Sequence, residues 1–572
     1  MSSAGTSGPS SGDRTGSGNG TPGGNGIPGG NGAPERAGTP GGNGTPGGNG
    51  APERAGTPGG NRPQGRGRSG EPDVGASGSA AAGPGAGGAA PARGGSGAAD
   101  GSGVGAAAVA AADAERVARR DDAVRAVVEQ GLLTPEQPVV ALLDVPGIRA
   151  SAAALRAAFD TVTAPGTPVL HAFAVKAAPL VPVLRLLADE GVGAEVASPG
   201  ELALARAAGV SPGRTVLDSP AKTAAELREA LALGIAVNAD NPQELERIDA
   251  MVRSAPTGSP IGLRVNPQVG GGSIGALSTA TATSKFGVAL RDEGARAWIL
   301  RAYADRPWLT RLHAHSGSQG MPLSLMAQGM AETYALAEEI NRHVGRRQID
   351  TIDIGGGLPV NFGSDATAPT YAQYARLLAE VVPGLFDGRY GLVTEFGRSL
   401  LAKHGTVVAR VEYAKSAGGR AIAVTHAGVQ VAARTVYAPG AWPLRIAAYD
   451  AKGRPKTGPD VVQDVAGPAC FAGDLLAEGR ALPLLEQGDL AAALDTGAYY
   501  FAHHYAYNSL ARPGIYGFAP DGGCSGHDTA EGDGRTDGGG GGVRFAVVRE
   551  PQTVEEIVAE SGGAHGPSLT AL

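Results

Sequence analysis

From about residue 150 to residue 400, short apolar segments alternate with helical stretches rich in Ala and Leu. The segments AEVAS, AVNAD and IGLRVN are typical of strands, and PGELALARAAG and TAAELREALALG are typical of the helices between them. Such alternation over about 250 residues predicts a parallel sheet, and this length suits a closed (β/α)8 barrel, also called a TIM barrel. A doubly wound open sheet is the alternative fold.

The segments on either side of this region do not show the same alternation of strands and helices. An N-cap candidate, apolar residues at helical spacing and a terminal glycine predict a helix over 113–131, and PVVALLDV predicts a strand at 138–145 that joins the C-terminal domain. From about residue 405, short β-type segments such as RAIAVTHAGV and VRFAVVRE are separated by turns, which predicts a β domain. The expected parts are a helix and strand over 113–145, a barrel over 146–404, and a β domain over 405–560 with a mobile Gly-rich loop at 519–542.

Both ends of the chain are expected to be disordered, over 1–112 and 561–572. The N-terminal stretch holds most of the excess among 93 glycines and almost no large apolar residue, so it cannot bury enough surface to offset the entropy of ordering. An 18-residue unit, TPGGNGIPGGNGAPERAG at 21–38, recurs with one change at 39–56. Glu35 interrupts the glycine period after a few triplets, which favours a flexible tail over a collagen-like helix.

Composition limits the classes of function. The formal net charge is −7 and no long basic run occurs, which argues against nucleic acid as a partner. We find no apolar stretch of about 20 residues and no secretory leader, so no membrane partner is expected. Two cysteines in unlike contexts, Cys470 and Cys524, do not suggest a disulfide framework, and a cytoplasmic location is expected.

Lys176, in HAFAVKAAP, follows a short apolar run at the expected C-terminal end of a strand. Burial there disfavours the ammonium form, and a neutral amine is a nucleophile that can form a Schiff base with an aldehyde. The structural alternative is a lysine that extends from a strand end into water. Other residues suited to catalysis or ligand binding also follow predicted strands. This placement favours the barrel, because active sites of such barrels lie at the C-terminal ends of the strands. These residues are Ser198 with Glu201; His313 and His315 with Ser318; Gly355, Gly356 and Gly357; and Glu395 with Arg398.

The residue types at these strand ends suit a phosphorylated, planar cofactor. Three glycines let backbone N–H groups approach an anion, and Ser318 and Arg398 can add donors, although a tight turn is the structural alternative. His315 could lie flat on the ring of such a cofactor. Alternatively, His313 and His315 could bind a metal ion, but no Cys, Asp or Glu follows at the spacing of a metal-ligand set. Glu395 could pair with a protonated ring nitrogen or, alternatively, with Arg398 at the rim. Together with Lys176 these features describe pyridoxal 5'-phosphate.

Nine short motifs occur in an order that is typical of one protein family. These motifs are AVKA around Lys176, AEVASPGEL at 194–202, RVNP at 264–267, SKFGV at 284–288, HSGSQ at 315–319, GGG at 355–357, EFGR at 395–398, GPAC at 467–470 and GAY at 497–499. From about 130 to 560 the chain resembles the fold-type III pyridoxal phosphate-dependent decarboxylases, that is, diaminopimelate and ornithine decarboxylases.

The resemblance implies a role for each matching residue. Lys176 carries the cofactor, Glu395 keeps its ring nitrogen protonated, and Cys470 is the general acid that returns a proton to Cα. Cys470 is expected to come from the other subunit of a homodimer with shared active sites. Further cofactor contacts are expected from Ser198, His315, Ser318, Gly355, Gly356, Gly357, Arg398 and Tyr499, and substrate contacts from Arg398, Arg434, Tyr437, Phe471 and Tyr499.

Two departures concern the substrate. The family has an acid directly after the cysteine, where this chain has Phe471, and a second acidic position is His426 here. We therefore expect a decarboxylase for an amino acid that is neither diaminopimelate nor ornithine. Glu395 and Cys470 favour decarboxylation over racemisation, and a racemase, an epimerase or a non-catalytic homologue are the alternatives.

Overall fold

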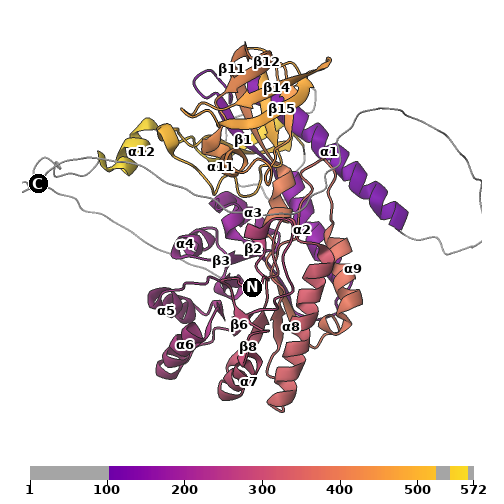
Figure 1. Ribbon diagram of the computed structural model, residues 1–572, viewed down its shortest axis with the longest axis vertical. Coiled ribbons are helices and arrows are strands. Elements are labelled where there is room, and N and C mark those ends of the chain that lie inside the picture. The colour runs from indigo at the N-terminus through magenta and orange to yellow at the C-terminus, as the bar shows by residue number, and fades with distance from the viewer. Residues whose placement is uncertain (1–101, 523–541, 564–572) are drawn as a thin grey trace, which may run out of the picture. The chain divides into compact units, whose positions relative to one another are not determined.

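The structure, a computed structural model, describes residues 102–522 and 542–563 (Figure 1). The 18-residue repeats, Cys524 and most of the expected 519–542 loop lie outside these residues. Within the described part, no helix has the length and apolar character needed to cross a membrane. We propose the domain boundaries expected above, with the barrel ending near residue 404.

Eight parallel strands close into a barrel. They follow one another around it in the order β2, β3, β4, β5, β6, β8, β9 and β10, and the pairings β5–β6 and β2–β10 complete the ring. The closed barrel is therefore confirmed and the open sheet is rejected. The strands are β2 (Val169–Ala174), β3 (Gly193–Val196), β4 (Thr215–Leu217), β5 (Ala236–Ala239), β6 (Ile261–Asn266), β8 (Leu309–His313), β9 (Thr351–Asp353) and β10 (Gly391–Thr394), with a short β7 (Val288–Ala289) beside β6.

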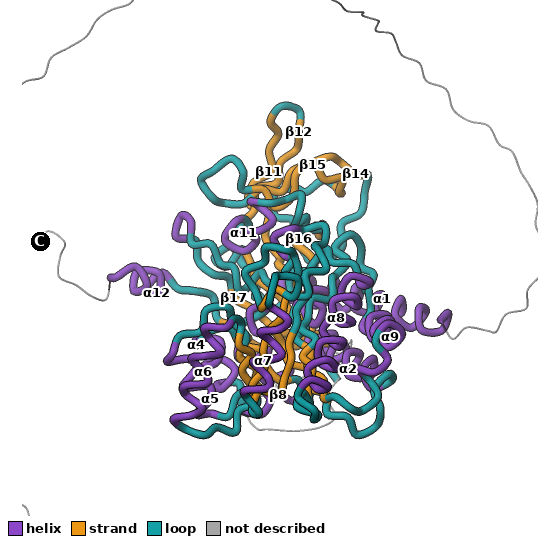
Figure 2. Tube along the Cα trace, turned by 60° about the horizontal axis from the view of Figure 1, so that its bottom comes forward, coloured by secondary structure: helices purple, strands orange, loops and turns teal. Residues whose placement is uncertain are grey.

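Helices surround this barrel, and Figure 2 shows them outside the strands. Their ends carry local signals: a capping box joins Thr223 and Glu226 at the start of α5, and Gly234 ends it in the left-handed conformation with φ 75°. The helices are α2 (Val145–Asp160), α3 (Val181–Asp189), α4 (Pro199–Ala207), α5 (Ala224–Leu233), α6 (Pro242–Ser254), α7 (Ala295–Asp305), α8 (Leu323–His343), α9 (Tyr371–Val381) and α10 (Arg398–Leu401).

A second sheet forms the β domain. Its main order is β15, β14, β12, β11, β1, β17 and β18, and β16 joins β13 to β11. The strands are β1 (Val139–Asp144), β11 (Gly405–Ala417), β12 (Arg420–Thr425), β13 (Ile446–Tyr449), β14 (Asp460–Ala466), β15 (Leu475–Pro483), β16 (Leu490–Leu494), β17 (Gly514–Pro520) and β18 (Val543–Arg549), with helices α11 (Val429–Tyr437) and α12 (Val554–Val558).

The N-terminal helix α1 (Ser102–Glu129) begins well before residue 113, where the sequence predicted its start. The run AAAVAAA at 106–112 has high helix propensity, which explains the extension. Near its C-terminal end, Val124 and Val127 pack with Val140 and Leu142 of β1, so the helix covers one face of the β sheet.

His404 lies where the barrel meets this sheet, and burial lowers its pKa to about 4. A histidine that stays neutral in the folded state makes the unfolded state the better proton acceptor below pH 6.5. The free energy of unfolding should therefore fall as the pH drops. For His404→Gln relative to the native chain, we expect the stability difference to shift by about 2 kcal/mol in favour of the variant between pH 7 and pH 5. Urea unfolding at the two pH values measures this shift, and an unchanged difference would contradict it.

Candidate active site

The predicted cofactor residues gather at the C-terminal ends of the barrel strands. Lys176 lies in a short 3-10 turn (Val175–Ala177) directly after β2, and Ser198 follows β3. His315 and Ser318 follow β8, the three glycines follow β9, and Glu395 follows β10. The parallel order of the strands therefore brings them to one end of the barrel, where barrel enzymes carry their chemistry.

Lys176 forms an ion pair with Glu195 of β3, at 2.5 Å between Nζ and Oε2. The Glu195 side chain is 1% exposed and that of Lys176 is 44% exposed, so the lysine extends along a partly open region while its Nζ atom contacts a buried carboxylate. Burial would lower the pKa of Lys176, but the neighbouring charges of Glu195 and Glu395 outweigh it and raise the pKa above its usual value. The free lysine is thus an ammonium, which corrects the neutral amine expected from burial alone.

Glu195 is a residue of this site that no motif in the sequence predicted. The sequence feature that could have identified it is an acidic residue inside the apolar segment AEVAS. In the barrel, Glu195 is paired with Ala174 of the adjacent strand β2, and Ala174 lies two residues before Lys176. Burial raises the pKa of Glu195 even though Lys176 opposes that change. Glu195 can therefore hold or receive the proton that Lys176 must lose before its amine reacts.

Replacing Glu195 with glutamine should lower the pKa of Lys176, because burial then loses its strongest opposing charge. We expect the rate at which cofactor-free protein takes up pyridoxal phosphate to reach its plateau about one pH unit lower or more. Stopped-flow absorbance against pH measures this. Glu201→Gln is the matched control, because that carboxylate accepts from the Ala197 amide instead; equal profiles for all three proteins would refute the prediction.

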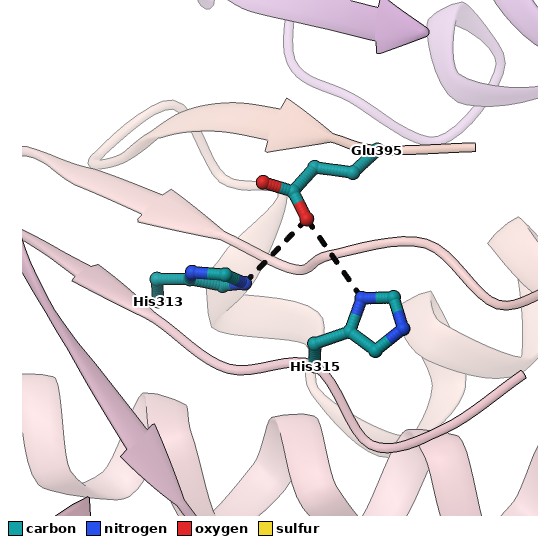
Figure 3. A group of neighbouring side chains, drawn as sticks. All are labelled: His313, His315 and Glu395. Carbon is teal, nitrogen blue, oxygen red and sulfur yellow. Dashed lines mark ion pairs between the residues drawn. The ribbon is translucent and has the colours of Figure 1, made fainter. Parts of the chain in front are cut away.

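Glu395 lies close to two histidines (Figure 3). Its Oε2 atom is 3.6 Å from His313 Nε2 and 3.7 Å from His315 Nδ1, and its Oε1 atom is buried without a hydrogen-bond partner. Burial, together with the nearby charges of Asp353 and Asp218, raises its pKa well above the usual value. The carboxyl is thus poised for a buried cationic partner. The alternative Glu395–Arg398 ion pair is absent from the described contacts, and Arg398 is directed elsewhere.

His315 is held as a neutral ring. Burial and the charges of Arg264 and Lys176 lower its pKa well below the usual value, and its Nδ1 atom accepts the Gly356 amide at 3.1 Å. The ligand atoms of His313, His315 and Glu395 all lie within 4.8 Å of one another, a spacing that a metal ion could use. However, a lone pair that already accepts a backbone amide is not free for a metal. The geometry thus suits a ring-packing role better.

The three glycines form a close-packed turn. Gly355 and Gly357 have φ of 65° and 92°, and a Cβ atom on Gly356 or Gly357 would collide with the carbonyl oxygen of Glu395 or Gly317. Arg398 reaches this turn's neighbour Ser318, with 3.4 Å between Nη2 and Oγ. Two further guanidinium N–H groups of Arg398 are buried without acceptors. This cradle fits a phosphate, as the unpartnered Glu395 oxygen fits a protonated ring nitrogen.

Tyr499 brings the β domain to this end of the barrel. Its amide donates to the carbonyl of Ala177, at 2.6 Å, and its φ of 66° is a left-handed conformation. Its ring packs against Arg398, whose guanidinium carbon is 4.4 Å from the ring centroid. Tyr499 therefore contacts both the lysine turn and Arg398. The hydroxyl of Ser198 instead accepts the Glu201 amide and caps α4, which leaves its proton available to a ligand.

Cys470, Phe471 and Tyr437 form a separate group on the β domain. Cys470 is an exposed free thiol whose amide donates to Asn508, at 2.7 Å. Phe471 stacks on Tyr437, with ring centroids 5.8 Å apart and an angle of 7°. Throughout 102–522 and 542–563, no recorded contact links this group to Lys176. One chain thus assembles the cofactor residues without the expected general acid.

A cavity of about 720 Å³ lies at the opposite end of the barrel, lined by residues such as Trp308, Arg311 and Asp350. It holds none of the predicted site residues. The functional site is therefore identified by its chemistry, not by cavity size.

Comparisons with known proteins agree with this chemistry. Residues 148–402 match the family model described as "Pyridoxal-dependent decarboxylase, pyridoxal binding domain". The chain is 33% identical over 349 residues to diaminopimelate decarboxylase of Pseudomonas aeruginosa, covering 61% of this chain and 80% of that relative. The corresponding enzyme of Aquifex aeolicus is 30% identical over 345 residues, covering 60% and 79%.

Solved structures show the same fold. Diaminopimelate decarboxylase from Helicobacter pylori, complexed with L-lysine, has a TM-score of 0.63 at 23% identity and covers 76% of this chain and 100% of that chain. This likeness shows the fold alone. Lysine/ornithine decarboxylase from Vibrio vulnificus, complexed with cadaverine, has a TM-score of 0.55 at 26% identity and covers 66% and 94%.

Proposed function

Because this chain belongs to the pyridoxal-dependent decarboxylases and is a pyridoxal phosphate-dependent carboxy-lyase, we propose that it decarboxylates an amino acid other than diaminopimelate or ornithine. The main support for this proposal is the residue after Cys470. It is Phe471 in this chain, whereas the enzymes that the chain resembles have an acidic residue at that position. A phenyl ring carries no negative charge and so cannot form the ion pair that a carboxylate offers to an ammonium group. Its ring is moreover committed to stacking on Tyr437.

The nearest acid in the cysteine loop does not replace the missing one. The carboxylate of Asp474 accepts the amides of Val429 and Ala469, both at 2.7 Å, so its oxygens are taken up in holding the loop. The second departure, His426, lies 3.6 Å from Glu412. The lysine and cadaverine bound to the two solved relatives each carry a distal amine. These acceptor losses argue against a substrate of that kind.

We assign the cofactor to the residues at the top of the barrel. Lys176 would carry it, Glu395 would hold its ring nitrogen, and His315 would pack on its ring. Ser318, Gly355–Gly357 and Arg398 would hold its phosphate, with Ser198 and Tyr499 as further contacts. When bound, the cofactor supplies the electron withdrawal that stabilises the charge left on Cα after CO2 departs.

The chain's own residues then manage charge and protons. Glu195 lies where it can take the proton from Lys176 Nζ. Burial keeps Glu395 away from water, so a hydrogen bond between its carboxyl group and a ligand would be strong. Cys470 is proposed to return a proton to Cα from the partner subunit of a homodimer, and its exposure supports that role.

We propose a cytoplasmic location, with which the free thiol of Cys470 is compatible.

Substitutions at Phe471 test the proposal on substrate. Phe471→Glu, alone or with His426→Asp, should raise CO2 release from diaminopimelate by about tenfold or more relative to the native chain, because it supplies an acceptor for the distal ammonium. Phe471→Leu is the matched control and should give no gain. If the native chain already releases CO2 from diaminopimelate as fast as from every other amino acid tested, the proposal is wrong.

A further inference from the structure

The N-terminal end of the barrel is hollow. A cavity of about 720 Å³ lies where β6, β8, β9 and β10 begin. Side chains normally fill the interior of such a barrel. Here Gly391 begins β10, and Gly258 and Gly388 lie in the loops before β6 and β10, so these positions add no side chain to the cavity. We call this cavity the barrel mouth, and its wall includes Trp308, Arg311, Arg347, Asp350 and Arg389.

Arg311 of β8 points into the barrel mouth. It lies two residues before His313, so the two side chains share one face of the strand, and His313 contacts Glu395 inside the barrel. On the neighbouring strand, Gly262 pairs with Arg311, and a Cβ atom on Gly262 would lie 3.0 Å from that of Arg311. The glycine therefore leaves room for the base of the arginine side chain.

A β-bulge precedes this arginine. The register between β6 and β8 shifts just before the pair Gly262–Arg311, so Thr310 has no partner on β6. The Thr310 carbonyl instead accepts the amide of Asp350, at 3.0 Å. Bulges change the direction of side chains and recur beside functional sites. The bulge therefore sets which side chains of β8 face the barrel mouth.

Two arginines of the barrel mouth lack a carboxylate partner. Within residues 102–522 and 542–563, neither Arg311 nor Arg347 forms an ion pair. The guanidinium carbon of Arg347 lies 5.0 Å from the ring centroid of Tyr390, a contact that does not neutralise the charge. Burial lowers the pKa of Arg311, although the charges of Asp353 and Asp350 oppose that change. An anion bound in the mouth would stabilise both cations.

The other charged side chains of the wall do not cancel this excess. Arg389 is paired with Asp387, at 2.8 Å, and with Glu338, at 3.0 Å. Among the described residues that line the mouth, Asp350 carries the one carboxylate, and it accepts the hydroxyl of Thr351, at 2.8 Å. Positive charge therefore prevails, and a cleft with one prevailing charge concentrates ligands of the opposite sign.

Trp308 gives the barrel mouth an aromatic wall. Its side chain is partly exposed, and the cavity is much larger than a single phosphate or carboxylate group. Ligand pockets typically combine an aromatic or apolar surface with a few charged groups that fix the ligand's orientation. The mouth is thus better suited to an organic anion than to an inorganic one.

An apolar layer separates the barrel mouth from the cofactor residues. Along β10, Gly391 lines the mouth, Val393 packs with Val216 and Ala236, and Glu395 lies at the other end of the strand. These three residues of β10 alternate with side chains of the opposite face, so they follow one another inside the barrel. A ligand in the mouth is therefore not part of a molecule that reacts at Lys176.

We propose that the barrel mouth binds a small organic anion, either a carboxylate or a phosphate monoester. Arg311 and Arg347 hold its acidic group, and its planar or apolar body packs against Trp308. This second site goes beyond the decarboxylation proposed above and does not depend on it.

Fluorine NMR of the pyridoxal phosphate-loaded chain tests the proposal. The chain has three tryptophans, so 5-fluorotryptophan gives three resonances, and Trp308→Phe assigns the one of interest. The probes are benzoate, its neutral match benzamide, and phenyl phosphate, at constant ionic strength. At least one of the two anions should shift the Trp308 resonance saturably and bind at least about tenfold more tightly than benzamide. Acetate and inorganic phosphate, which have no ring, should bind more weakly than their ring-bearing counterparts.

Substitutions locate the acidic group. Arg311→Met and Arg347→Met should each weaken binding of the anion by about tenfold or more. Arg347 is exposed, so we expect its substitution to leave the fold intact, which an unchanged visible absorbance of the bound cofactor would show. Arg206→Met is the matched control, because it removes an exposed arginine paired with Glu229 outside the mouth, and it should bind the anion like the native chain.

The resonance of Trp442 reports on the catalytic end, because this ring packs against Arg398. Anions that shift Trp442 alone overturn the proposal, as do equal binding of benzamide and both anions, or equal binding of the anions to both arginine variants and the native chain. CO2 release by the same protein tests the proposed function separately. A chain that binds the anion at Trp308 but releases no CO2 refutes decarboxylation and supports the second site.

Discussion

Replacing Lys176 with alanine is expected to abolish decarboxylation, with a fall in kcat of about 10³-fold or more. The reason is positional: Nζ of this lysine alone projects from the end of β2 toward Glu195 and Glu395, and a methyl group leaves nothing to carry the cofactor. Activity with excess cofactor and the visible absorbance after gel filtration are the measurements. The variant should also show no cofactor attached to this position by mass spectrometry after borohydride reduction.

Lys222→Met provides a matched control for this substitution. Lys222 is also at the barrel's C-terminal end but is fully buried in a pair with Glu244, at 3.0 Å. Its loss should reduce stability without removing cofactor absorbance. Retention of a covalently attached cofactor in Lys176→Ala would contradict the assignment.

Replacing Glu395 with glutamine should separate activity from stability. An amide cannot keep a ring nitrogen protonated, so we expect kcat to fall by about 10²- to 10³-fold while the cofactor still attaches to Lys176. The cofactor-free variant should be more stable than the native chain, because a neutral group replaces a buried carboxyl surrounded by Asp353, Asp218 and Glu195.

The sign of the pH dependence follows from the raised pKa of Glu395. Above the pKa of the unfolded chain, the folded state either retains a proton or carries a poorly solvated charge, so its stability cost grows as the pH rises. The advantage of Glu395→Gln should therefore be about 2 kcal/mol at pH 8 and shrink toward pH 5. Urea unfolding of cofactor-free protein at both pH values measures it. An advantage that grows on acidification would show that this carboxyl is stabilised as an anion.

The barrel was predictable because its signals are local. Each strand and helix between 150 and 400 has its own apolar run or capping residue, and parallel order then places Lys176, Glu395 and the glycines at one end. The start of α1 was missed because an alanine run among glycines carries no cap. The parallel pairing of β1 with β17 joins residues near 142 and 516, and no short-range pattern encodes it.

The site was predictable where a residue type carries the chemistry by itself. The protonation state of the site could not be predicted in this way. The ammonium form of Lys176 depends on Glu195, and only the register between β2 and β3 brings Glu195 close to the lysine. The position of Arg434 depends on a break within α11, where Ala432 has φ −138° and ψ 43° and redirects the chain before Arg434. The separation of Cys470 from Lys176 likewise depends on long-range folding of two domains.

We propose that this chain releases CO2 from an amino acid at Lys176, and that this amino acid is not diaminopimelate. The most direct measurement is CO2 release by the cofactor-loaded native chain from a panel of amino acids that includes diaminopimelate and ornithine, with Lys176→Ala as the blank. We predict turnover of another amino acid in the panel and a rate at least about tenfold lower for diaminopimelate and ornithine. Fastest turnover of diaminopimelate, or equal CO2 release by Lys176→Ala, would contradict the account.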